Sequence, residues 1–292
     1  MRIFLTGATG FLGSAIVTNL TGEGHHIVGL VRSEQAATTL RAAGAEPLVG
    51  DLRDHESLRR GVSQADAIIH TAFDHDFSRM AENCEVDRNA IEAIGSAVVG
   101  SNKKLIVTSG LPPIIGRVAT EADVLPAGEG GMPRVSEQTA LALTELGIRA
   151  SVVRMPQVHN EQKQGFASYL LSHARESGVS AFVDGGKNRW PAVHRLDAAR
   201  LYGLVLHRGE SGQCYHAVSE EGVPFRQIAE AIAKRLDVPL ASLSGEEAAR
   251  HFGWLDRIAQ MDVPASSERT KLSTQWRPIE VATLVDDILQ SA

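Results

Sequence analysis

Short apolar runs alternate with amphipathic stretches along the first half of the chain. Runs such as RIFLTG, HIVGLVR and KKLIVTSG predict buried strands, while FLGSAIVTNLTGEG and SEQAATTLRAAG carry the spacing of helices. Strands that alternate with helices pair in parallel, through right-handed crossovers that place helices on both faces of the sheet. We therefore expect an α/β fold built on a doubly wound parallel sheet.

The pattern becomes irregular after Pro156. Helical spacing dominates there, and PASSERTKLSTQWRP is a polar tail. We expect a first domain over residues 1–155 and a smaller C-terminal lobe over residues 156–292, with a segment near 192–220 returning to the first domain. No linker composition separates the two parts, so they are expected to pack as one body.

Composition and charge exclude several classes of protein. Hydrophobic residues make up 43% and charged residues 22%, as is ordinary for a folded chain, and the net charge of −6 argues against a nucleic-acid partner. No apolar run approaches the roughly 18 residues of a membrane span, so no membrane partner is expected. Cys84 and Cys214 stand alone, which predicts free thiols. A buried first strand explains the N-terminus better than a signal peptide, so we expect a cytoplasmic protein.

The strongest motif is TGATGFLG, from Thr6 to Gly13, which lies between the first predicted strand and the first predicted helix. Gly7 lets the chain turn sharply, Gly10 lets the backbone approach a pyrophosphate, and Gly13 lets the helix pack on the strand. The helix N-terminus then offers free N–H groups and the positive end of its dipole to phosphate. The motif predicts a dinucleotide site at this turn.

The spacing GxxGxxG resembles that of the extended short-chain dehydrogenase/reductase family, the relatives of NAD-dependent sugar-nucleotide epimerases and dehydratases. GDL at 50–52, HTAF at 70–73, VTSG at 107–110, VVRMPQVHN at 152–160 and PAVHRLDAARLYGLVL at 191–206 resemble further segments of that family, so the likeness covers nearly the whole chain. It implies a Rossmann-type fold, a nicotinamide cofactor, a small-molecule substrate and a homodimer. The expected cofactor contacts are Gly7, Thr9, Gly10, Phe11, Leu12, Gly13, Arg32, Ser33, Asp51, Leu52, Thr71, Ala72, Phe73 and Thr108.

The end of the second strand bears on the choice of cofactor. NAD binders place an acidic residue there to hold the ribose 2′-hydroxyl, whereas this chain has Arg32 and Ser33. A guanidinium and a hydroxyl fit a 2′-phosphate through charge-assisted hydrogen bonds. We therefore expect NADP(H) as the preferred cofactor, while Glu34, one residue further on, leaves NAD(H) open.

The stretch GGMPRVSEQTALALTELG, residues 130–147, predicts a helix with Pro133 in its first turn and Gly147 at its end. The family resemblance implies a Tyr and a Lys one helical turn apart on this helix after the fifth strand, with the Tyr exchanging a proton with the substrate. Alignment places Pro133 at the Tyr position and Glu137 at the Lys position, and a shift by one residue brings in Arg134 and Gln138. None of the three tyrosines has a Lys four residues later. The usual proton relay is therefore expected to be absent, with Glu137 either bonding the ribose hydroxyls or facing solvent.

Other side chains near the expected strand ends are candidates for the chemistry. Ser109, at the end of the fifth strand, and His75, beyond the fourth, are the candidate catalytic groups, with the capping and solvation of a loop as the alternative for His75. Gln157, His159 and Trp190 are candidate substrate contacts, with packing as the alternative for each. No metal-ligand spacing accompanies them, so no metal is expected.

Three functions fit the sequence. The first is an atypical NADP(H)-dependent oxidoreductase acting on a small carbonyl, alcohol or activated alkene. The second is a non-catalytic NADP(H)-binding sensor or regulatory protein. The third is an epimerase- or dehydratase-like enzyme that retains its cofactor.

Overall fold

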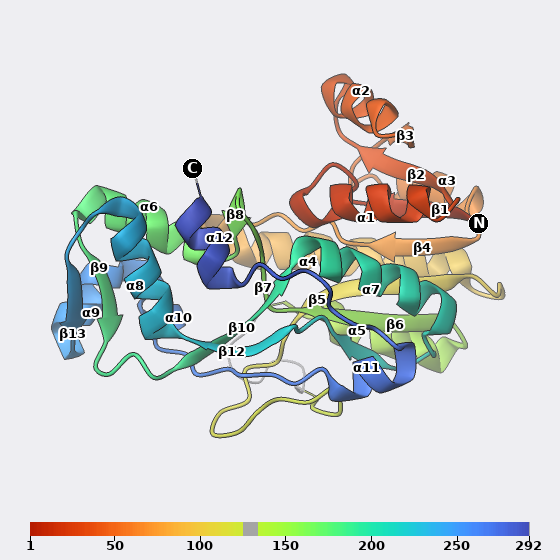
Figure 1. Cartoon of the computed structure of the whole chain (residues 1–292). Helices are drawn as coiled ribbons and strands as arrows, with labels where there is room; N and C mark the ends of the chain where they lie inside the picture. Colours follow the sequence, from red (N-terminus) through yellow and green to blue (C-terminus); the bar gives the residue numbers. More distant parts are fainter. Residues whose placement is uncertain (125–133, 292) are drawn as a thin grey trace.

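A seven-stranded parallel sheet forms the centre of the protein, which is described here by a computed structural model covering residues 1–124 and 134–291 (Figure 1). The strand order is β11-β6-β5-β4-β1-β2-β3, and every neighbouring pair is parallel. The order starts at β1 in the middle and winds outward twice, which confirms the doubly wound α/β prediction. The strands are β1 (Arg2–Thr6), β2 (His26–Val31), β3 (Glu46–Val49), β4 (Ala67–His70), β5 (Lys104–Gly110), β6 (Arg149–Met155) and β11 (Cys214–His216).

Helices cover both faces of this sheet, as the alternating pattern predicts. One face carries α1 (Phe11–Gly22), α2 (Glu34–Ala42) and α7 (Arg195–Arg208), whose apolar side chains share one core with the strands. The other face carries α3 (His55–Ser63), α4 (Met80–Val98) and α5 (Ser136–Ala142), which build a second core. The 3-10 turns η1 (Phe77–Arg79) and η3 (Leu143–Leu146) precede α4 and follow α5.

The C-terminal lobe lies beside the carboxyl ends of the strands, at the left of Figure 1. A four-stranded sheet in the order β12-β10-β7-β8 and a parallel pair β13-β9 pack with helices around a third core. Its strands are β7 (Gln157–Asn160), β8 (Lys163–Gln164), β9 (Ser180–Val183), β10 (Arg189–His194), β12 (Glu220–Pro224) and β13 (Leu240–Leu243). Its helical elements are α6 (Ala167–Ser177), α8 (Phe225–Leu236), α9 (Gly245–Phe252), η4 (Gly253–Leu255), α10 (Asp256–Ala259) and α12 (Leu284–Gln290).

The lobe differs in detail from the sequence prediction. Its strands are mostly four to six residues long, and burial does not alternate along β7, β9, β10 or β12, so the period-2 signal of a half-buried strand is missing there. The polar tail contains a further helix, α11 (Glu268–Thr274), which buries Thr270 and Thr274 against α7 and β11. No helix among the described residues is both long and apolar enough to cross a membrane.

The helix expected after the fifth strand is shorter than its sequence suggests. It begins at Ser136, and Pro133, expected at its first turn, lies outside the described residues. The 3-10 turn η3 continues it and ends at Gly147, whose φ of 76° is the left-handed conformation that glycine allows. The predicted C-terminal stop is thus confirmed, and the start lies about one turn later.

Candidate functional site

The glycine turn between β1 and α1 has no room for a side chain at Gly7 or Gly13. Gly7 has φ of 74°, and a Cβ built there would lie 2.7 Å from Thr71 Oγ1. A Cβ on Gly13 would lie 1.9 Å from the Gly7 carbonyl oxygen, closer than any real contact. The Gly10 N–H donates to that same oxygen over 2.9 Å and closes the turn. Close packing of α1 on this turn therefore requires Gly13, for the reason the motif predicts.

Helix α1 begins without a side-chain cap, because its N-cap residue is Gly10. No side chain competes there for the first-turn N–H groups of Phe11, Leu12 and Gly13, so they can face an anion together with the positive end of the helix dipole. This arrangement fits the pyrophosphate of a dinucleotide. Thr9 precedes the helix in an exposed position.

Two cations near this helix end were missed by the sequence analysis. The Arg195 guanidinium lies 4.8 Å from the centre of the Phe11 ring and donates to Ser14 Oγ over 3.0 Å. Lys163 Nζ lies 5.9 Å from the same ring. Both reach α1 from distant parts of the chain, so only tertiary structure brings them here. They add positive charge beside the expected phosphates.

The end of β2 presents an unopposed cation. Arg32 is exposed and makes no hydrogen bond to any described residue. Glu34 is paired with Arg41 further along α2, at 2.8 Å. Ser33 is the N-cap of that helix, where its hydroxyl oxygen accepts the Ala36 N–H over 3.2 Å and keeps its own proton to donate. Glu34, the acid for which the sequence analysis kept NAD(H) as an alternative, is thus bound to Arg41.

The segments after β3 and β4 lie at the same edge of the sheet. Asp51 accepts the Arg53 N–H over 2.9 Å within its own turn, and Leu52 is partly buried against the core beneath. Thr71 donates its hydroxyl proton to the Thr6 carbonyl oxygen over 2.8 Å, which fixes the chain beside Gly7. Ala72 N–H donates in turn to Thr6 Oγ1 over 3.3 Å.

A buried hydrogen-bonded chain runs beneath this edge. Thr6 Oγ1 lies 2.9 Å from His70 Nδ1, and His70 Nε2 lies 3.0 Å from Asp87 Oδ1. The other Asp87 oxygen accepts the Ser136 hydroxyl over 2.5 Å, and the oxygen of Ser136 accepts Arg134 Nε–H over 2.8 Å. Burial alone would raise the pKa of Asp87, but His70 and the nearby Arg134 charge lower it overall, so the carboxylate stays ionised.

Arg134 ends this chain at the carboxyl ends of the strands. Its Nη2 donates to the Thr108 carbonyl oxygen over 3.1 Å, and its guanidinium lies 4.1 Å from the centre of the Phe73 ring. Two of its five N–H groups are used, one in the bond to Thr108 and one in the bond to Ser136, which leaves three without a partner among the described residues. Burial lowers its pKa, yet a guanidinium stays charged at any physiological pH. Sequence reasoning considered Arg134 only as a substitute in an alignment.

The candidate catalytic hydroxyls differ in their surroundings. Thr108 Oγ1 donates to the His70 carbonyl oxygen over 2.8 Å and lies 2.6 Å from the Tyr202 hydroxyl, so it is fully engaged. Ser109 Oγ has no hydrogen-bond partner among the described residues, although Ser109 is nearly buried. His75 is exposed, and crowding of its ring by protein atoms and the charges of Arg134 and Lys163 lower its pKa. Ser109 and His75 stay predictions.

Glu137 neither faces solvent nor is free to bond a ribose, which corrects the expectation from the sequence. Its two carboxylate oxygens accept Nε–H and Nη2–H of Arg154, each over 2.6 Å. Both side chains are buried, that of Arg154 completely. The Glu137 carboxylate is therefore occupied by the buried Arg154 guanidinium of β6 and is not free for a ligand. Breaking this pair would leave a buried charge without a partner, which is costly.

The three candidate substrate-binding residues, Gln157, His159 and Trp190, each bond or pack with other residues of the protein. The Gln157 side-chain oxygen accepts the Phe166 N–H over 2.7 Å. His159 is fully buried, with its Nδ1 2.6 Å from Asp287 Oδ2. Trp190 is 1% exposed and packs edge-on against Phe225, with ring centres 4.9 Å apart. As they lie, His159 and Trp190 offer no surface to a ligand.

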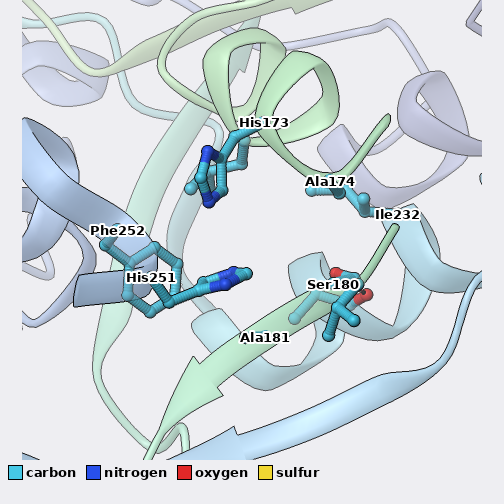
Figure 2. A pocket seen from close by; sticks show the side chains of 10 residues that line it. His173, Ala174, Ser180, Ala181, Ile232, His251 and Phe252 are labelled. Carbon is cyan, nitrogen blue, oxygen red and sulfur yellow. Dashed lines mark hydrogen bonds between the residues drawn. The ribbon is translucent and has the colours of Figure 1, made fainter. Parts of the chain in front are cut away.

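Figure 2 shows a small pocket inside the lobe, between α6, β9, α8 and α9. The rings of His173 and His251 meet edge to face there, with centres 4.6 Å apart. Burial and the neighbouring ring lower the pKa of His251. The pocket's volume of about 10 Å³ has room for roughly one water molecule, so it does not serve the cofactor or a substrate.

One group of three potential metal ligands comes together in the described part of the chain. Glu23, His25 and His207 lie at the opposite end of α1 from the glycine turn, with the two Nε2 atoms 3.2 Å apart. The group is partly exposed and takes no part in the site around Arg134.

Known proteins resemble this chain in sequence and in fold. The family model described as NAD(P)H-binding matches residues 7–173. A Schizosaccharomyces pombe protein described as uncharacterized is 46% identical over 100% of this chain and 99% of its own. A Stigmatella aurantiaca 4-hydroxy-2-methyl-3-oxo-4-farnesyl-3,4-dihydroquinoline-1-oxide ketoreductase is 26% identical over 91% of this chain and 84% of its own. The dTDP-glucose 4,6-dehydratase of Streptomyces venezuelae, solved with NAD and TYD bound, is similar in fold, with a TM-score of 0.77 and 18% identity over 100% of this chain and 95% of its own.

Proposed function

This chain belongs to the NAD(P)H-binding proteins of the extended short-chain dehydrogenase/reductase family, and we propose that it is an NADP(H)-dependent reductase of a small carbonyl compound or activated alkene. The observation that carries the proposal is Arg134, a fixed cation with unused N–H groups at the carboxyl ends of the strands. Ligands bind at that edge in open α/β sheets.

The cofactor preference follows from the end of β2. Arg32 is unopposed, and Ser33 keeps a hydroxyl proton to donate, so both can bond a ribose 2′-phosphate. Glu34, which would repel that phosphate, is paired with Arg41. We therefore favour NADP(H), held at its pyrophosphate by the uncapped start of α1 and by the nearby Arg195 and Lys163.

In this reaction the protein must stabilise the negative charge that develops on the substrate oxygen. Bound NADPH supplies a hydride, and a ketone that accepts it and one proton becomes an alcohol. As charge develops on the substrate oxygen, unused Arg134 N–H groups and the Ser109 hydroxyl can donate hydrogen bonds to it. Asp87 and Ser136 fix the guanidinium by holding its Nε. The proton comes from Ser109, His75 or water, because no Tyr–Lys pair is present in the sequence.

The names of distant relatives agree with carbonyl reduction. The Stigmatella protein is a ketoreductase, and a 2-alkyl-3-oxoalkanoate reductase of Stenotrophomonas maltophilia is 24% identical over 82% of this chain. We propose the cytoplasm as the location, since Cys84 and Cys214 are both free thiols. A homodimer stays a prediction.

The test is turnover of NADPH with a panel of aldehydes, ketones and enones. We expect steady oxidation of free NADPH, and we expect Arg134→Met to lower kcat by about 100-fold or more while the Kd for NADPH changes little. Arg88→Met, which removes a surface arginine paired with Glu85, is the matched control and should leave kcat unchanged. Equal activity of Arg134→Met and wild type would overturn the assignment of Arg134.

The sensor function has one observation in its favour. The position of the family's Lys carries Glu137, which is committed to Arg154 and is not available for chemistry. Tight NADPH binding without turnover across the whole panel would establish the sensor and reject the reductase. Cofactor that stays bound through turnover would indicate the epimerase- or dehydratase-like alternative.

A further inference from the structure

A row of aromatic rings leads outward from Arg134. The guanidinium lies on Phe73, whose ring centre is 5.2 Å from that of His75. The His75 ring lies 6.4 Å from that of Phe77, and Phe77 lies 5.2 Å from Trp254. The planes of this last pair are tilted by 30° to each other. We call these four rings the aromatic row.

The row crosses from the sheet domain to the lobe. Phe73, His75 and Phe77 follow β4, whereas Trp254 belongs to η4 in the lobe. Phe166 and Tyr169, at the start of α6, support Phe77 from the lobe side, with ring centres 5.6 Å and 5.9 Å away. The row therefore lies where the two parts of the chain meet, and it starts at the expected cofactor edge.

The row is incompletely buried. Trp254 is 55% exposed and His75 is exposed, while Phe73 and Phe77 are partly buried. The other two tryptophans, Trp190 and Trp276, are 1% exposed each. Large aromatic surfaces left open beside a site favour ligands with flat, apolar faces, because stacking and burial both stabilise such a complex.

The polar groups at the inner end restrict what such a ligand can carry. Arg134 offers hydrogen-bond donors beside Phe73, and Ser109 directly follows Thr108, whose carbonyl oxygen Arg134 binds. Such donors suit one oxygen with developing negative charge. The outer rings of Phe77 and Trp254 offer little to the many hydroxyls of a sugar, whose burial without partners is costly. The combination favours a ligand with one polar end and a flat body.

We infer that the aromatic row is the substrate surface, and that the substrate is an aromatic or conjugated ketone whose oxygen lies at Arg134 and whose flat body stacks along Phe77 and Trp254. This inference rests on the proposed reductase function for the chemistry. Recognition of the flat body is separable from it, since stacking requires no hydride transfer.

Binding can be measured through Trp254 itself. In the NADP⁺-saturated protein, 2-acetylnaphthalene should quench tryptophan fluorescence saturably, since Trp254 is the one exposed tryptophan of three. Equilibrium dialysis should give a Kd for 2-acetylnaphthalene about tenfold higher for Trp254→Leu than for wild type. Trp254→Phe, which keeps an aromatic ring, should restore a Kd close to that of wild type. Ile279→Ala, which truncates a 65% exposed aliphatic residue outside the row, is the control and should bind as wild type does.

Turnover distinguishes this inference from the proposed function. With NADPH, 2-acetylnaphthalene should be reduced with a KM at least about tenfold below that of 2-dodecanone, and Trp254→Leu should remove the difference. Saturable quenching without any alcohol product would uphold the aromatic row and reject the reductase. Reduction of both ketones with equal KM, unchanged in Trp254→Leu, would uphold the reductase and overturn the aromatic row.

Discussion

Glu137 and Arg154 form a buried ion pair that joins α5 to β6 through two hydrogen bonds of 2.6 Å. Other N–H groups of the Arg154 guanidinium reach the Asp123 carbonyl oxygen at 2.6 Å and His216 Nε2 at 3.0 Å. The position where the family resemblance implies a catalytic Lys thus holds a structural acid. Its charge is matched to a cation inside the fold and not to a cofactor.

Restoring the family's Lys should therefore harm the protein. Glu137→Lys would place a second cation beside a fully buried Arg154, so we expect a loss of about 3–5 kcal/mol or more in the free energy of unfolding. Urea denaturation at neutral pH measures it. Glu145→Lys, the same change at an exposed position of η3, should stay within about 0.5 kcal/mol of wild type. Wild-type stability of Glu137→Lys would contradict the pairing.

The same cluster predicts a pH dependence of stability. Burial, followed by the Arg154 charge, lowers the pKa of His216 to about 4 from its ordinary value of 6.5. The unfolded chain therefore takes up a proton at higher pH than the folded chain does. Stability should be unaffected by this group above about pH 6.5 and should fall as the pH drops from there to about 4.

His216→Gln isolates that contribution. An amide can accept from Arg154 without titrating, so the variant should lose less stability than wild type between about pH 6.5 and pH 4. Denaturation midpoints measured across this range give the two slopes. Parallel slopes would mean that His216 titrates alike in the folded and unfolded chains.

Two glycines of α1 should respond differently to the same substitution. A Cβ on Gly13 meets the Gly7 carbonyl oxygen at 1.9 Å, whereas a Cβ on Gly22 meets nothing within 4 Å. Gly13→Ala should lower stability and weaken NADPH binding, because α1 must move away from the turn. Gly22→Ala should be neutral or stabilise by up to about 1 kcal/mol, since alanine favours helix. Thermal denaturation and NADPH titration test both variants.

Charge at the end of β2 should select the cofactor. Arg32→Glu is expected to raise the Kd for NADPH by roughly 10- to 100-fold, since a charge-assisted contact to the 2′-phosphate becomes a repulsion. The Kd for NADH should change little. Glu34→Gln should change neither Kd greatly, because Glu34 is already paired with Arg41. Equal weakening of both cofactors by Arg32→Glu would contradict a 2′-phosphate contact.

Local sequence was sufficient wherever the physical constraint is itself local. Gly10 and Gly13 predict their turn because a side chain at either position would crowd the Gly7 carbonyl oxygen only a few residues away. Gly7 predicts it because the turn needs a positive φ there, which glycine adopts without strain. The alternation of strands and helices predicts the doubly wound sheet because each element must bury one apolar face. Gly147 predicts its helix end because glycine is the residue that most readily adopts the left-handed conformation after a helix, and it does so here.

The short strands of the lobe could not be found in this way. The β10 strand is buried at four consecutive positions, and β7 pairs with it over only three residues, so neither alternates. Likewise α11 is recognisable by its contacts with α7 and β11 and not by an apolar stripe. Their existence depends on neighbours that are distant in sequence.

The sequence by itself determined the sheet, the glycine turn and the absence of the Tyr–Lys pair, since each depends on residue types at fixed spacing. Only the tertiary structure decided what replaced that pair. It joined Glu137 to Arg154, and it held Arg134 at the strand ends through Ser136 and Asp87. The interaction between two charges depends on their distance in space, and a buried charge without a partner is costly. Such pairs can therefore be identified only in the folded chain.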